Sequence, residues 1–244
     1  MITLKNISKS FNNHLIIPGI TFNIEDNRFY TVIGPNGCGK STLLNVISGT
    51  LEKDSGEIIS SNKELRMGYV WQNYRSSLFP WLSISENISF PLRIQGLSSK
   101  KRREAVQSLI DDLNIDINLK SKVYNISGGK QQLISILRAL IIKPHLIILD
   151  EPFSALDQYK RWHIGFELEK MWLAQKRSVF FVSHDVDEAV LLADEIILIN
   201  KHGCIEKTIL NPLPRNRTKD ALTNTIHIKC KEEIVKFLFE QNNE

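Results

Sequence analysis

Nine residues, from 34 to 42, have the types and spacing of a phosphate-binding loop. They read G-P-N-G-C-G-K-S-T and satisfy the pattern of Gly, any four residues, Gly, Lys, then Ser or Thr. Glycines let the backbone curl so that several N–H groups converge on one anion, while Lys40 can reach the outer phosphates and the Ser41 hydroxyl can ligate Mg²⁺. We therefore expect a nucleoside triphosphate to bind here, through Gly34, Pro35, Asn36, Gly37, Cys38, Gly39, Lys40, Ser41 and Thr42.

An acidic pair, Asp150 and Glu151, follows the wholly apolar run 146–149. Such a run predicts a strand buried on both faces, and the carboxyl ends of parallel strands form the ligand-binding edge of an open α/β sheet. There Asp150 can hold Mg²⁺, and Glu151 can take a proton from a water that attacks the γ-phosphate. The alternative is a solvated strand end without a function.

Two further polar residues follow predicted strands in the same way. His184 comes after 179–182, where it could touch the γ-phosphate, although a lone histidine is more often structural. Gln72 comes after 67–71, where a metal or the attacking water could sit. We expect both side chains to lie along the edge that carries the acidic pair.

Residues 127–129, Ser-Gly-Gly, open a predicted helix and form a second candidate anion site. Ser127 is suited to the cap position, and Gly128 and Gly129 expose N–H groups at the positive end of the helix dipole. One phosphate loop with two anion sites indicates that each subunit closes over a nucleotide held mainly by another subunit.

The elements that must position these residues alternate along most of the chain. Residues 2–26 predict short antiparallel strands with turns at Asn12-Asn13 and Pro18-Gly19. Residues 29–33, 56–59, 67–71, 146–149, 179–182 and 196–199 predict further strands, and helices are expected near 98–113, 129–142, 156–174, 186–193 and the C-terminus. The order strand, helix, strand predicts a parallel sheet.

Composition sets wider limits. The chain has 244 residues, 42% of them hydrophobic, which suffices for one large core or two lobes. No apolar run approaches the roughly 20 residues that span a bilayer, and no signal-peptide pattern is present, so we expect a cytoplasmic protein. Three scattered cysteines predict neither a disulfide framework nor a zinc site. A net charge of +4 gives no reason to expect nucleic acid as a partner.

Taken together, these motifs resemble the nucleotide-binding subunit of ABC transporters over nearly the whole chain. The resemblance implies ATP as the nucleotide, with Mg²⁺ held by Ser41, Asp150 and Gln72. It implies Glu151, His184, Gln72 and Lys40 as catalytic residues, Ser127 to Gly129 as the signature that contacts the partner's ATP, and Ser154-Ala155-Leu156-Asp157 as the D-loop. Phe11 falls at the position of the aromatic residue that stacks on adenine.

The same resemblance implies a fold and a set of partners. The fold is an α/β P-loop NTPase core with a mainly parallel sheet, an N-terminal antiparallel β-subdomain and an α-helical insert. We expect the ATPase domain in 1–210, with the insert at about 76–142, and a C-terminal tail with a short helix in 211–244. Expected partners are a second, identical ATP-binding subunit, transmembrane permease subunits and a periplasmic or lipoprotein solute-binding protein, with the chain peripheral on the inner face of the membrane.

Segments 78–87, 183–189 and 213–217 are most similar to importers of nitrate, sulfonates and taurine. The signature departs from the usual pattern at Lys130, where Gln is typical, and at Leu133, where a basic residue is common. We expect Lys130 to add positive charge near the partner's phosphates, so that Lys130→Gln weakens ATP-driven dimerisation. The apolar stretch 78–81 is expected to form part of the permease socket, with core packing of Phe79 and Trp81 as the alternative.

Other functions stay open at this point. An ATPase subunit of a different importer or of an exporter would carry the same motifs. A soluble ABC protein acting on ribosomes or DNA usually has two cassettes or a long coiled coil, and a nucleotide kinase would lack residues 127–129. Cys38, at a helix start where a thiol pKa tends to fall, is expected to be a small tolerated residue and not a redox switch.

Overall fold

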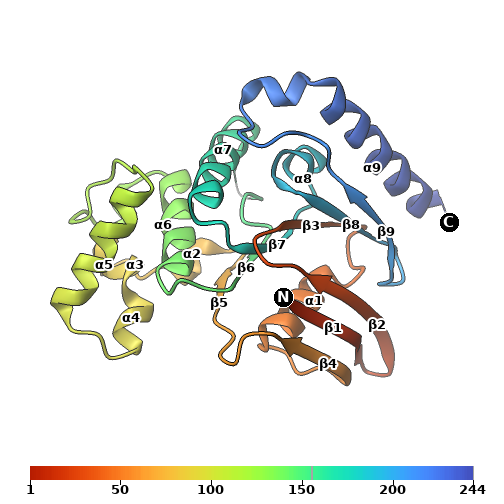
Figure 1. Cartoon of the computed structure of the whole chain (residues 1–244), viewed down its shortest axis with the longest axis horizontal. Coiled ribbons are helices and arrows are strands. Elements are labelled where there is room, and N and C mark those ends of the chain that lie inside the picture. The colour runs from red at the N-terminus through yellow and green to blue at the C-terminus, as the bar shows by residue number, and fades with distance from the viewer. Residues whose placement is uncertain (155, 244) are drawn as a thin grey trace. The chain divides into compact units, whose positions relative to one another are not determined.

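The computed structural model describes residues 1–154 and 156–243 and divides into two compact units. The first unit joins Met1–Leu65 to Arg177–Glu244, and the second is Arg66–Lys176. Figure 1 labels the elements of both. The domain boundaries expected from the sequence remain a prediction.

The first unit contains two sets of strands. The antiparallel set consists of β1 (Ile2–Phe11) between β2 (His14–Ile24) and β4 (Ser55–Ser60). In the other, β3 (Phe29–Ile33) pairs in parallel with β7 (Ser178–Val182) and with β8 (Glu195–Ile199), and β9 (Ile205–Leu210) pairs antiparallel with β8.

Helices complete this unit. They are α1 (Lys40–Ser48), α8 (Val186–Leu192), the 3₁₀ turn η2 (Lys219–Thr223) and α9 (Thr225–Asn243). With 19 residues, α9 is longer than the short terminal helix expected. It lies beside α8, as Figure 1 shows, and buried Ile234 and Phe237 join a cluster that includes Ala189 and Val190 of α8.

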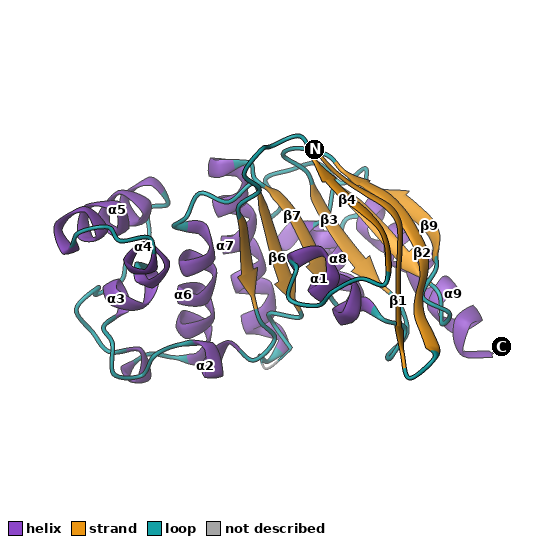
Figure 2. Ribbon diagram, turned by 90° about the horizontal axis from the view of Figure 1, so that it is seen from below, coloured by secondary structure: helices purple, strands orange, loops and turns teal. Residues whose placement is uncertain are grey.

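The second unit contains one parallel strand pair and most of the helices. β5 (Met67–Val70) pairs with β6 (Leu146–Asp150), whose five residues are all buried, as the apolar run predicts. Its helices are α2 (Tyr74–Ser77), α3 (Ile84–Ile88), α4 (Phe90–Ile94), α5 (Ser99–Asp112), η1 (Val123–Asn125), α6 (Gly128–Leu140) and α7 (Gln158–Gln175). Figure 2 shows α3, α4, α5 and α6 side by side.

Helix boundaries follow the expected capping chemistry. The Ser98 side chain accepts from the N–H of Lys101 and begins α5, and the Ser127 side chain accepts from the N–H of Lys130 and begins α6. Leu113, expected inside the first of these helices, is instead its C-terminal cap. None of the helices in the described part of the chain combines the length and apolarity that a bilayer crossing needs.

The turn expected at Pro18-Gly19 is wrong. Both residues lie inside β2, opposite a stretch of β1 in which the pairing register shifts. β2 is at the edge of its sheet, which is where a proline is tolerated within a strand. Gly19 has a φ of 102°, which a glycine adopts without strain. The turn at Asn12-Asn13 is confirmed between two long strands.

Candidate ATP-binding and catalytic residues

The phosphate loop lies in the first unit, between β3 and α1. Gly37 and Gly39 have φ values of 80° and 99°, so the loop uses backbone conformations that other residues rarely adopt. Gly39 caps α1 without a side-chain hydrogen bond, which leaves the first N–H groups of the helix to a ligand. The loop is therefore built as an anion cradle that fits a nucleotide's phosphates.

Lys40 is buried and folds back over this loop. Its Nζ donates to the carbonyl oxygens of Gly34 at 2.8 Å and Pro35 at 2.7 Å. These two contacts hold the ammonium beside the loop. Ser41, the first residue after Lys40, is exposed.

The expectation of a lowered Cys38 pKa is wrong. The thiol is buried, and burial raises its pKa more than the nearby Lys40 ammonium and the backbone N–H groups lower it. A thiol held in its neutral form reacts slowly, which agrees with the expectation that Cys38 is not a redox switch.

Two other predicted site residues of the first unit lie at element ends. Phe11 ends β1 with 45% of its surface exposed, and the Lys9 ammonium lies 5.6 Å from its ring centroid. His184 is exposed in the short connection between β7 and α8. Both side chains are accessible to a ligand.

In the second unit, the acidic pair and Gln72 come together as predicted from the parallel strands. The Gln72 Nε2 donates to the Glu151 Oε2 at 3.0 Å. Glu151 has a positive φ of 42°, which turns the chain sharply after β6, and Asp150 is buried at the end of that strand. A base and a neutral amide in hydrogen-bond contact can jointly orient a water molecule.

Tyr69 is a site residue that the sequence reasoning missed. It lies on β5, opposite Ile148 of β6, and its hydroxyl donates to the Asp150 Oδ2 at 3.4 Å. Burial and the adjacent carboxylate raise its pKa, so the hydroxyl stays protonated and remains a donor. The signal was available, because Tyr69 lies three residues before Gln72 and brings a hydroxyl group into a strand whose other side chains carry no hydroxyl.

The signature residues line an open cavity in the second unit. Ser127 is exposed and, with Gly129 and Lys130, borders a space of about 330 Å³ that Lys160 and His163 of α7 also line. A Cβ at Gly128 would come within 2.9 Å of the Tyr74 hydroxyl. This glycine is therefore needed for close packing as well as for an exposed N–H group.

Asp157 begins α7 as its N-terminal cap. Its carboxylate accepts from the N–H of Lys160 at 3.1 Å and pairs with the Lys160 ammonium, contacts that lower its pKa. Ala155, inside the expected D-loop, lies outside the described residues.

Fold and motifs together define an ABC ATPase cassette, and the comparisons agree. Residues 17–154 match the family described as ABC transporter, and the chain belongs to that family. It is 37% identical over 230 residues, 90% of each chain, to the aliphatic sulfonates import ATP-binding protein SsuB of Bacillus cereus. It is 33% identical to an uncharacterized ABC transporter ATP-binding protein of Methanocaldococcus jannaschii, over 96% of this chain and 93% of that one.

Solved structures agree with the fold. A bacterial ABC transporter cassette solved as a dimer superposes with a TM-score of 0.72 at 28% identity, over 86% of this chain and 98% of that one. The same cassette in a post-hydrolysis state, bound to ADP and Pi, superposes with a TM-score of 0.72 at 27% identity and with the same coverage. The expected fold class and the ATPase class are thereby confirmed.

Proposed function

We propose that this chain is the ATP-binding and ATP-hydrolysing subunit of an ABC importer that takes up a small anion of the sulfonate, taurine or nitrate kind. The observation that carries the proposal is 37% identity to a sulfonate import subunit over 90% of both chains. The exposed anion cradles at the phosphate loop and at Ser127 support it. The solute itself never touches this subunit, so its identity rests on ancestry alone.

In the proposed cycle two copies close over two ATP molecules. The phosphate loop of one copy holds each nucleotide, with Phe11 stacked on its base, and residues 127–129 and Asp157 of the other copy complete the site. Lys40 neutralises the outer phosphates, and Ser41, Asp150 and Gln72 would hold Mg²⁺, which supplies charge stabilisation when bound. The dimeric cassette among the related structures supports this arrangement.

Residues at the strand ends then catalyse the hydrolysis. Glu151 takes a proton from the attacking water, and His184 orients the γ-phosphate or that water. A carboxylate accepts more than one hydrogen bond, so Glu151 can bind the water while it keeps its contact with Gln72. Closure and reopening of the dimer would drive two permease subunits at the inner face of the membrane, fed by a solute-binding protein outside.

Reconstitution tests the proposal. The chain is assembled in proteoliposomes with the permease and solute-binding protein encoded beside it, and ATP hydrolysis is measured with taurine, methanesulfonate or nitrate on the binding-protein side. One of these anions should stimulate hydrolysis and accumulate inside, and the complex carrying Glu151→Gln should do neither. Hydrolysis that no such anion stimulates, or net solute export, would contradict the proposal.

A further inference from the structure

The segment after β9, residues 211–231, holds both ends of α8. This helix has only seven residues, and isolated helices of that length are not stable in water, so its position depends on what it contacts. Its N-terminus follows His184 directly. The contacts that fix the position of α8 therefore also fix the connection that contains His184.

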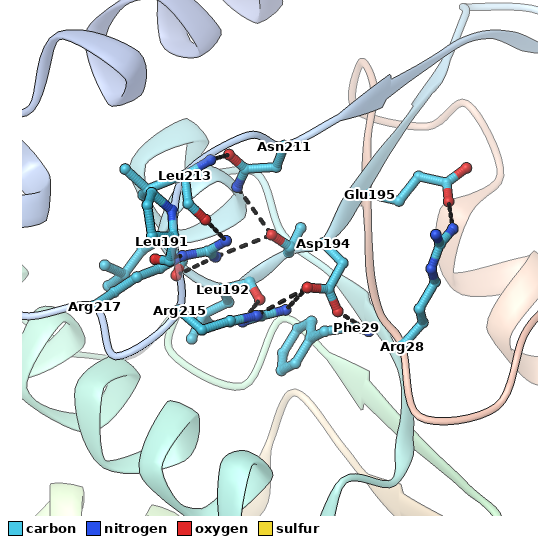
Figure 3. A network of polar contacts seen from close by, with 12 residues as sticks. Arg28, Phe29, Leu191, Leu192, Asp194, Glu195, Asn211, Leu213, Arg215 and Arg217 are labelled. Carbon is cyan, nitrogen blue, oxygen red and sulfur yellow. Dashed lines mark hydrogen bonds and ion pairs between the residues drawn. The ribbon is translucent and has the colours of Figure 1, made fainter.

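At the C-terminal end of α8, side chains of the segment satisfy the carbonyl groups that the helix leaves open. The Arg217 guanidinium donates to the carbonyl oxygens of Leu191 at 2.7 Å and Ala193 at 2.9 Å, and Arg215 donates to that of Leu192 at 2.8 Å. Asn211 Nδ2 donates to the carbonyl of Val190 at 2.7 Å. Figure 3 shows these side chains pointing at the helix end.

This contact is buried and favourably charged. Arg217 is only 6% exposed, and Arg215 also forms an ion pair with Asp194, just past the helix. Two guanidinium groups at a helix C-terminus stabilise the negative end of its dipole. The last turn of α8 is thus held by charge-assisted hydrogen bonds from residues more than 20 positions away in sequence.

At the N-terminal end, α9 holds the first turn through Asp187. His227 Nε2 lies 3.0 Å from the Asp187 Oδ1, and the Lys231 ammonium lies 2.8 Å from both carboxylate oxygens. His227 is 1% exposed, so this contact lies inside the packing between the two helices.

The first turn is coupled in turn to His184. The Asp185 carboxylate accepts from the N–H groups of Asp187 at 2.9 Å and Glu188 at 3.1 Å, and the Ser183 hydroxyl accepts from the N–H of Asp185 at 2.9 Å. The Ser183 hydroxyl also contacts the Glu188 carboxylate. His184 is therefore flanked on both sides by residues bound to the first turn of α8.

We infer that the segment 211–231 sets the position of His184 through α8, so that Arg217, His227 and Lys231 are positioning residues for ATP hydrolysis. The inference rests on the proposed function, in which His184 acts on the γ-phosphate or the attacking water. Loss of a contact to Asp187 lets the first turn shift, and a misplaced catalytic group slows the chemical step while nucleotide binding by the phosphate loop continues.

The test uses two variants of the full chain. Asp187→Asn removes the carboxylate on α8, and Lys231→Met removes its ammonium partner on α9. Either change should lower kcat for ATP about 3- to 30-fold with KM for ATP unchanged, and Lys231→Arg should restore most of the rate. Glu233→Gln is the matched control, because it removes only the ion pair between Glu233 of α9 and Lys207 of β9. Unchanged kcat in both test variants would overturn the inference.

A double-mutant cycle distinguishes an effect of Asp187 on the position of His184 from a general loss of stability. If Asp187 acts through His184, then Asp187→Asn should cause no further loss of kcat in the His184→Ala background. An equal loss in both backgrounds would show that Asp187 acts elsewhere. If His184→Ala alone leaves hydrolysis unchanged, the proposed role of His184 fails. Hydrogen exchange of residues 183–193 then tests the structural part of the inference, that the segment 211–231 fixes α8 and His184. Faster exchange in Asp187→Asn is expected, and unchanged exchange would contradict it.

Discussion

Glu151 and Gln72 form the contact at the centre of the proposed hydrolysis mechanism. Their 3.0 Å hydrogen bond joins the proposed general base to the residue expected to orient water or metal. The sequence indicated that both residues lie along one edge of a parallel sheet, because each follows a short apolar run. The direct pairing of the two strands comes from the structure. The hydrogen bond itself could not be predicted, since it depends on the sharp turn at Glu151.

Replacing the base without changing its shape gives the first prediction. Glu151→Gln should lower kcat by about 10²- to 10⁴-fold, the usual contribution of proton transfer, and should leave ATP affinity within about twofold of wild type. Hydrolysis by release of phosphate and binding by a fluorescent ATP analogue measure the two effects. Glu104→Gln, on an exposed position of α5, is the control, and normal turnover in Glu151→Gln would remove Glu151 from the mechanism.

At the scale of elements, the prediction from sequence was accurate where burial alone determines the structure. β6 was recognisable because a strand with two buried faces must be continuously apolar. β2 was misread because proline and glycine predict a turn unless the strand is at an edge, and edge position is a property of the sheet and not of the local sequence. The contacts of Arg217 were equally invisible, because a lone arginine normally predicts a surface position.

Asp187 gives a prediction about pH and stability. The hydrogen bond from His227, and then Lys231, lower the pKa of its carboxyl below the ordinary 3.8, so the ionised form is favoured in the folded state. A depressed pKa contributes stability above pH 3.8, and this contribution is lost as the pH falls through the lower folded-state value. The free-energy difference of unfolding between wild type and Asp187→Asn should therefore be largest near neutral pH and shrink below about pH 4.

Urea unfolding at several pH values between 3 and 7 measures this difference. Asp54→Asn is the comparison, since the Asp54 pKa is also lowered but its carboxylate is exposed. A difference between wild type and Asp187→Asn that stays constant across this range would contradict the account of the contact between α8 and α9.

For the molecule as a whole, the central question is how it joins the rest of a transporter. The prediction that the whole stretch 78–81 is exposed as a permease socket is wrong at Leu78, which is buried in the core. Trp81 is 69% exposed, and the half-buried Phe79 packs on Phe90 with ring centroids 4.4 Å apart. Asn87 holds the backbone of Phe79 through hydrogen bonds in both directions, of 2.8 and 3.0 Å. An exposed indole on so rigid a support favours a partner surface.

The prediction is that Phe79→Ala combined with Trp81→Ala abolishes co-purification with the permease while ATP binding by the chain persists. Apolar contact area at the centre of an interface carries much of its affinity, so a loss of at least tenfold is expected. The single variant Trp81→Ala changes only an exposed side chain, so it should fold normally and still weaken assembly. Tyr124→Ala is the control, because Tyr124 is another exposed aromatic residue. If the double variant and the single variant Trp81→Ala both still assemble with the permease, these side chains serve packing and not the interface.

The proposed function depends most on the claim that ATP joins two copies of this chain, because residues 127–129 have no proposed role in ATP hydrolysis without a partner's nucleotide. Sedimentation equilibrium of the full chain carrying Glu151→Gln, with and without Mg²⁺ and ATP, tests it directly. We predict the 28.0 kDa mass of one chain without nucleotide and twice that mass with ATP, and a return to one chain when Ser127→Glu is added. A chain that binds ATP and still sediments as a single copy at micromolar concentration would contradict the account.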